Sequence, residues 1–387
     1  MLEKILQDKS IILKTIYVLI IVNIGNVTSL LIQIMLSRTI SIESFSFFYS
    51  SIALISLCAS PIISQHLIIQ ENISLLNNND NYKKYYINKL YKFFSLFIIG
   101  YFIFFLVFYD EIQSYLNNYQ DTTYLKLFGI LIFVLISLIP SSFLISQKKY
   151  SLPSKIFTIL DILRLIVLFI YFYFFDGESI DFVINIQLFF VSLIFFFNHF
   201  FMSKSLKLPP KKIKQHINSV SKNSKIAIYS MIFPIILQLD IVIVTYLFDS
   251  ILTSKYIVVS TISKIVYFFF GSIYPIIFNE FLDKIKKIKI GLVLFYIFSI
   301  IIGGLIITIG GKYFIILTYD QNFHSSANLI YLICPSIILL SLSNIACSYL
   351  IAEKSYSFVK YLITIVLIFV LITIYITKSI ELFVLIF

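Results

Sequence analysis

The sequence predicts an all-α polytopic membrane protein with eleven complete transmembrane helices and a partial twelfth. Long apolar runs alternate with short polar loops along all 387 residues. Charged residues make up only 13% of the chain, against ~25% in soluble domains, and the mean hydropathy is +0.97. The third observation is that positive charge falls on every second loop.

The apolar runs are long enough to cross a bilayer, which takes about 20 residues at the α-helical rise. We expect spans at residues 11–36, 44–68, 91–109, 123–146, 155–175, 181–203, 225–248, 254–279, 289–309, 326–351 and 357–377. The remaining segment, Ser379–Phe387, is apolar but extends only about 13 Å as a helix. We therefore expect a twelfth helix that is cut short.

Basic residues are concentrated on alternate loops. With these spans, 23 of the 30 lysines and arginines lie at the N-terminus or on even-numbered loops, and five lie on odd-numbered loops. Because Lys and Arg accumulate on the cytoplasmic side, the N-terminus is predicted to be cytoplasmic. The same bias accounts for the net charge of +11, so we expect no nucleic-acid partner.

The longest connection divides the predicted spans into two groups. It lies between the sixth and seventh spans and contains Pro209-Pro210 and seven lysines from Lys204 to Lys225. We expect an N-terminal bundle at 1–205, a basic cytoplasmic linker at 206–224 and a C-terminal bundle at 225–387. A shift of 207 residues places Gln33 on Asp240, as expected for parallel transporter repeats around a central cavity.

Four ionisable side chains lie inside predicted spans, where each charge costs roughly 2.5–3.5 kcal/mol near a helix centre. Asp161 and Arg164 share one face of a helix. Either they only neutralise each other, or Arg164 binds a phosphate group and Asp161 orients it. Asp240 and Lys264 lie at similar depths on adjacent spans, so we expect an ion pair, either purely structural or acting as a gate or coupling-ion site.

Other polar residues gather on the first and seventh spans. Asn23, Asn26 and Gln33 share one face of the first span, where they either join helices by hydrogen bonds or line a polar path through the membrane. Gln238 lies two residues before Asp240. Arg38 ends the first span, where it either snorkels to the interface or lies at the mouth of a cavity.

No pattern for catalysis or cofactor binding is present. The three cysteines lie in apolar runs without the spacing of a disulfide framework or a metal site. The sequence has no glycine-rich nucleotide-binding loop, so any transport through it would draw its energy from an ion gradient. We therefore expect no cofactor, no resident metal and no catalytic residue.

Several segments resemble one family of exporters. Leu30–Arg38 followed by Phe45–Tyr49 resembles the first hairpin of polysaccharide exporters, in which the first helix ends in a small residue and Arg. Gln238–Asp240 with Lys255-Tyr256 resembles their seventh and eighth helices, and Tyr150–Leu168 resembles their fifth. The chain thus resembles the O-antigen and capsule repeat-unit flippases of the multidrug/oligosaccharidyl-lipid/polysaccharide exporter superfamily. It departs from them in the short twelfth helix and in the first turn, where Ile40–Glu43 replaces the usual glycines.

This resemblance implies a flippase in the cytoplasmic (inner) membrane of a bacterium. It would move a polyprenyl-diphosphate-linked oligosaccharide repeat unit of O-antigen lipopolysaccharide or capsule by alternating access. Its partners would be that lipid-linked saccharide, membrane lipid, a coupling ion (proton or Na⁺), and a polysaccharide polymerase with its chain-length regulator. The candidate substrate-binding residues are Arg164, Lys264, Arg38, Asn23, Asn26 and Gln33. The candidate coupling or gating residues are Asp240, Asp161 and Gln238.

Two alternatives remain open. A drug/cation antiporter of the same superfamily would favour acidic cavity residues, whereas here two acids are balanced by two bases. A membrane-embedded polysaccharide polymerase or ligase would need a large outer loop bearing catalytic groups. The longest predicted outer loops, Asp110–Thr122 and Gly310–Ser325, are short, so we do not expect an enzyme.

Overall fold

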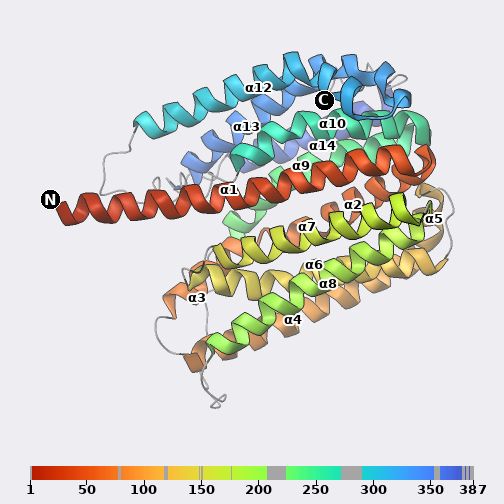
Figure 1. The fold of residues 1–387 in the computed structure, drawn as a ribbon. Coiled ribbons are helices and arrows are strands. Elements are labelled where there is room, and N and C mark those ends of the chain that lie inside the picture. The colour runs from red at the N-terminus through yellow and green to blue at the C-terminus, as the bar shows by residue number, and fades with distance from the viewer. Residues whose placement is uncertain are drawn as a thin grey trace. The chain divides into compact units, whose positions relative to one another are not determined.

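The computed structural model describes residues 2–76, 80–116, 121–147, 149, 151–175, 177–206, 224–271, 290–352, 358–376, 380 and 383. Every regular element in these ranges is helical (Figure 1). The elements are α1 (Leu2–Thr39), α2 (Ile42–Ile63), α3 (His66–Leu75), α4 (Asp80–Val107), α5 (Tyr109–Tyr115), α6 (Asp121–Ser146), α7 (Ser151–Phe174), α8 (Ile180–Ser205), α9 (Ser224–Leu247), α10 (Ser250–Gly271), α12 (Ile290–Thr318), the 3-10 helix η1 (Gln321–Leu329), α13 (Ile330–Ala352) and α14 (Phe358–Ile376).

The predicted class, an all-α polytopic membrane protein, is confirmed. Within the described ranges, nine helical stretches are long and apolar enough to cross a membrane, and Met231–Leu247 of α9 is a shorter apolar helix. Helices suit this setting because each backbone N–H and C=O group bonds within the helix, whereas lipid hydrocarbon offers these groups no hydrogen-bond partner. Each expected span overlaps described helix, although the span predicted at 254–279 is described only to Gly271. Most of the basic linker and of the partial twelfth helix lies outside the described residues. The count of eleven complete spans and the cytoplasmic N-terminus stay predictions.

The second predicted span, 44–68, is interrupted. Helix α2 contains Pro61 and ends at Ile63, and α3 begins at His66. Between them the backbone N–H of Gln65 bonds the Ile62 carbonyl three residues back, and the Ser64 hydroxyl bonds the carbonyl of Pro61 at 2.7 Å. A tightened turn and a serine that competes for backbone carbonyls both end a regular α-helix.

The helix predicted at 289–309 instead continues to Thr318. Gly310 and Gly311, expected to begin an outer loop, lie inside α12, and the apolar segment Tyr313–Leu317 extends it. A Cβ atom on Gly311 would lie 2.2 Å from Ile330 of α13, and one on Gly304 would lie 2.2 Å from Ile338. These two glycines therefore permit close packing of α12 on α13, the role small residues have between membrane helices.

Contacts group the chain into two compact units, which are described separately. One unit combines residues 1–46 with 240–387, and the other is 47–239. Helix α1 thus belongs to the same unit as α10, α12 and α13. The predicted N-terminal bundle had instead grouped α1 with the helices that follow it in the sequence. The division into bundles at 1–205 and 225–387 stays a prediction.

In the unit of residues 47–239, the most extensive packing is that of α6 on α8. Helix α7 also packs on α8, through an apolar cluster centred on Ile156, Leu160 and Phe190. Helices α3 and α4 contact α6. This arrangement places α7, which carries Asp161 and Arg164, beside α8.

In the unit of residues 1–46 and 240–387, α10 packs against both α12 and α13 (Figure 1). Helix α1 contacts α10, and η1 contacts α12 and α10. Residues of the tail also join this unit, since the buried Phe383 ring lies edge-on to Tyr256 with centroids 5.5 Å apart. Helix α10 is therefore surrounded by other helices, and it carries the polar residues of the first candidate site.

Candidate functional site

A buried polar cluster forms around Asp240 of α9. The Lys264 ammonium on α10 donates to Asp240 Oδ1 at 2.8 Å, so the predicted ion pair is confirmed. The other carboxylate oxygen accepts from the Tyr256 hydroxyl at 3.0 Å and from the Ser260 hydroxyl at 2.8 Å. Asp240 is 0% exposed and Lys264 is 3% exposed. Every hydrogen-bonding direction of this carboxylate thus faces protein.

Helix periodicity explains why one carboxylate meets three partners. Tyr256, Ser260 and Lys264 follow one another at intervals of four residues, so they lie along one face of α10. An isolated charge in hydrocarbon is costly, whereas a paired and fully hydrogen-bonded one is tolerated. The Asp240 cluster therefore holds α9 against α10 and leaves neither charge uncompensated.

A second polar cluster, centred on Gln33, joins α1 to α10 and α12. The Gln33 amide donates to Thr261 of α10 at 3.0 Å and accepts from the Tyr319 hydroxyl, beside the end of α12, at 3.2 Å. Gln33 is buried. Of the two interpretations left open for this residue, the contacts favour hydrogen bonding between helices.

The other predicted residues of α1 have different surroundings. Arg38 is exposed at the end of α1, and its guanidinium donates to the Leu317 carbonyl at 3.3 Å in the last turn of α12. Such a contact suits the partial negative charge at a helix C-terminus. Asn23 is buried and bonds the Leu19 carbonyl of its own helix, while its Oδ1 has no partner among the described residues. Asn26 is partly buried.

Arg164 forms the main charged site of the other unit. It lies on α7, and Nη2 pairs with Asp161 at 3.1 Å, as their spacing predicts. Nη1 donates to the side-chain carbonyl of Gln187 on α8. The Arg164 side chain is 13% exposed and Asp161 is buried.

One donor of Arg164 remains unsatisfied. Its Nε is buried and has no hydrogen-bond partner in the described part of the chain. A buried donor left unpaired costs about 1–3 kcal/mol. The guanidinium is therefore oriented by Asp161 and Gln187, and it keeps capacity for a further acceptor.

The spans also carry an ion pair of a different kind. Lys126 at the start of α6 lies 2.6 Å from Asp181 at the start of α8, and both side chains are partly exposed. Exposed pairs contribute little to stability. This pair lies in the same unit as Arg164 and provides a natural control for it.

Sequence reasoning did not identify Ser260, Thr261, Gln187 or Tyr319 as partners. Periodicity contained a signal for Ser260, because it lies four residues before Lys264 on the same helix face. The remaining three are polar residues whose partners depend on helix packing. Gln238 is partly buried two residues before Asp240, and its coupling role stays a prediction.

The site residues offer hydrogen bonds and charge. In the described residues, no group of three His, Cys, Asp or Glu side chains is placed to hold a metal ion. The Asp240 and Arg164 sites differ in one respect. Both carboxylate oxygens of Asp240 accept hydrogen bonds, whereas Nε of Arg164 has no partner in the described residues.

No family model matches this sequence, and no curated protein matches it. Among solved structures, lipid II flippase MurJ in an inward closed conformation is similar, with a TM-score of 0.69 over 96% of this chain and 84% of that chain at 13% identity. The Vibrio cholerae MATE transporter VcmN in its bent form matches with a TM-score of 0.63, covering 98% of this chain and 93% of that one at 13% identity. A single-residue mutant of VcmN gives 0.63, with 98% and 92% covered at 11% identity. At these identities the likeness establishes the fold, and it is the fold that the resemblance to the exporter superfamily implies.

Proposed function

We propose that the protein is a flippase that moves a polyprenyl-diphosphate-linked oligosaccharide repeat unit across the bacterial cytoplasmic membrane by alternating access. Its fold is similar to that of a protein named as a lipid II flippase and to that of MATE transporters. That likeness supports transport in general. The choice of substrate rests on the chemistry of the buried charged groups.

Arg164 is the single observation that carries the proposal. A guanidinium is permanently charged and matches phosphate oxygens in a bidentate way that an ammonium cannot. Asp161 and Gln187 fix two of its nitrogens, and the buried Nε remains without a partner in the described residues. A diphosphate oxygen accepting from Nε would satisfy that donor while the lipid tail stays in the bilayer.

The same inventory weighs against a drug/cation antiporter. A site for cations needs carboxylates that face a cavity, but Asp240 is saturated by Lys264, Tyr256 and Ser260. Asp161 is buried and paired with Arg164. An anionic substrate group is the better match for Arg164, whose buried Nε has no hydrogen-bond partner among the described residues.

The Asp240 cluster has a different part in the proposal. Lys264 is buried within its ion pair, so its contact with substrate would require the pair to separate. We assign Asp240 and Lys264 to gating. The transport path would be closed while the two side chains are paired, and it would open when Lys264 leaves Asp240 for another anionic partner. A proton or Na⁺ gradient would supply the energy, and a polymerase with a chain-length regulator would consume the product.

Genetic depletion tests the proposal in the cell. Loss of this protein should remove surface polysaccharide while lipid-linked repeat units accumulate in the cytoplasmic leaflet, and the wild-type gene should restore export. Unchanged surface polysaccharide together with a new sensitivity to cationic drugs would instead identify the antiporter.

A further inference from the structure

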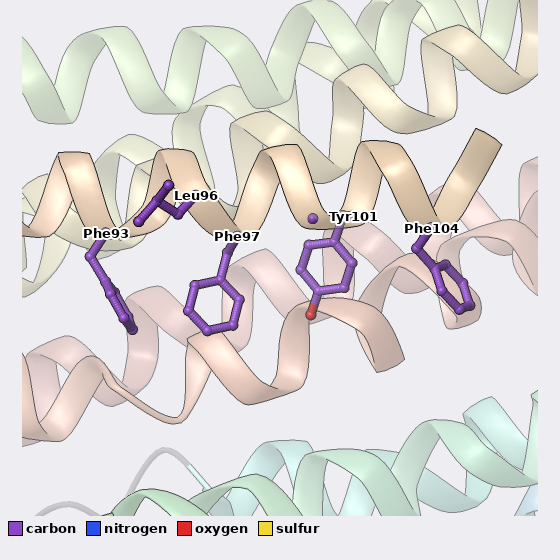
Figure 2. A pocket seen from close by; sticks show the side chains of 6 residues that line it. Phe93, Leu96, Phe97, Tyr101 and Phe104 are labelled. Carbon is purple, nitrogen blue, oxygen red and sulfur yellow. The ribbon is translucent and has the colours of Figure 1, made fainter. Parts of the chain in front are cut away.

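Helix α4 carries an apolar groove on its surface. The groove has a volume of about 520 Å³ and is lined by Phe93, Leu96, Phe97, Gly100, Tyr101 and Phe104. Figure 2 shows the aromatic side chains projecting from one side of the helix. Tyr101 is fixed because its hydroxyl donates to the Cys58 carbonyl of α2, while Leu96 and Phe104 are exposed.

The floor of the groove is open at Gly100. A Cβ atom added there would meet nothing within 4 Å. Phe93 and Phe97 contact each other edge-on with centroids 4.9 Å apart, and they form one wall. The absence of a side chain at Gly100 leaves room for an apolar chain to lie between the rings.

Two exposed lysines stand at one end of the groove. Lys89 precedes Phe93 by four residues, so it lies on the same helix face, and Lys92 is adjacent to Phe93. Both lysines are exposed. Basic residues at the edge of a membrane span attract the phosphate groups of anionic lipids.

The length of the groove matches one leaflet. Phe93 to Phe104 spans eleven residue steps, about 16 Å of helix, which is about half of the ~30 Å hydrocarbon core. An acyl chain that starts at the level of Phe93, about one helical turn beyond Lys89, would end near the bilayer centre. The lysines at one end of the groove therefore match a lipid phosphate group, and the apolar length matches an acyl chain of the same lipid.

We propose that α4 holds an anionic phospholipid, with its phosphate on Lys89 and Lys92 and one acyl chain in the groove. The two lysines select an anionic lipid over a neutral one, and the length of the groove fits one acyl chain. The site lies on a helix that carries none of the residues assigned to transport, so it is independent of the proposed flippase activity.

Brominated lipids test this site directly, because the chain contains no tryptophan. Phe97→Trp introduces a single fluorophore into the groove, and bromine on an acyl chain quenches it on contact. In vesicles of mostly neutral lipid, brominated phosphatidylglycerol should quench this tryptophan much more strongly than the same fraction of brominated phosphatidylcholine. The expected enrichment of the anionic lipid at the groove is roughly tenfold.

Phe189→Trp on α8 is the matched control. Phe189 is also exposed and lies eight residues after Asp181, as Phe97 lies eight after Lys89. Asp181 is paired with Lys126, so the two brominated lipids should quench alike there. In the Phe97→Trp protein, Lys89→Gln with Lys92→Gln should abolish the preference, whereas Lys204→Gln with Lys360→Gln, two exposed lysines on other helices, should preserve it.

Gly100→Leu tests the acyl-chain part of the proposal. The new side chain fills the groove, so quenching at position 97 should fall, while Gly310→Leu, at another glycine with open space around it, should leave it unchanged. Equal quenching by the two lipids at position 97 would overturn the proposal. So would a preference that survives the Lys89/Lys92 change, or quenching that Gly100→Leu does not alter.

Discussion

Lys264→Met is expected to destabilise the protein by about 3–5 kcal/mol, because it leaves Asp240 charged and buried without its cation. Tyr256 and Ser260 would still donate to the carboxylate, but two neutral donors do not replace an ammonium. Thermal unfolding of the purified protein and its amount in the membrane measure this loss.

The double change Asp240→Asn with Lys264→Met is the control for this prediction. It removes both charges, so most of the lost stability should return. A Lys264→Met protein as stable as the wild type would contradict the buried ion pair as the contact that holds α9 to α10. Transport by the recovered double variant then tests gating: a stable but inactive protein supports it, and a fully active one rejects it.

Arg164→Lys is expected to impair export while the protein remains in the membrane, and Arg164→Ala to abolish export. Lysine keeps the charge but loses the bidentate geometry of the guanidinium. The measurement is surface polysaccharide in a strain that lacks the chromosomal gene and carries each variant, with membrane levels determined in parallel.

Neutralising both Asp161 and Arg164 distinguishes two roles for Arg164, which are binding of phosphate and compensation of the Asp161 charge. If Arg164 only compensates Asp161, the double change Asp161→Asn with Arg164→Gln should restore export, since no buried charge remains. We expect it to remain inactive. Lys126→Gln with Asp181→Asn removes an exposed pair in the same unit and should leave export unchanged. Full activity of the Asp161/Arg164 double variant would leave the phosphate-binding role without support.

The sequence predicted both buried ion pairs, for physical reasons that apply to any membrane span. A charge in hydrocarbon must find a partner, and helix geometry leaves few candidates at the right depth. Asp161 and Arg164 are one turn apart, and Asp240 and Lys264 lie equally deep on consecutive spans. The observed distances of 3.1 and 2.8 Å confirm these pairings.

Neutral polar partners could not be predicted in the same way. A hydroxyl in a helix can bond a carbonyl of its own preceding turn, as Ser263 does with Val259 and Thr245 with Ile241. Ser260 instead reaches across to Asp240. Only the packing of α9 on α10 distinguishes these cases.

The positions of helix ends could not be predicted from hydropathy either. The hydropathy of the run 44–68 gave no sign of the turn at Ser64–Gln65, although Pro61 lies just before it. The turn itself is formed by local side-chain and backbone hydrogen bonds. Where α12 continues through Gly310 and Gly311, Gly311 packs closely on Ile330 of α13, whereas Gly310 has open space around it. Glycines inside apolar runs are ambiguous, because they end helices in water but permit close helix contacts in membranes.

Flipping of a defined substrate by the purified protein tests the central claim most directly. Proteoliposomes would contain a polyprenyl-diphosphate-linked oligosaccharide in both leaflets, and a membrane-impermeant glycosidase would be added outside. With the wild-type protein and an ion gradient, sugars from the inner leaflet should become accessible to the enzyme, whereas Arg164→Ala vesicles should expose only those of the outer leaflet. Equal accessibility in wild-type, Arg164→Ala and protein-free vesicles, with cation exchange by the wild-type protein, would contradict the flippase and identify an antiporter.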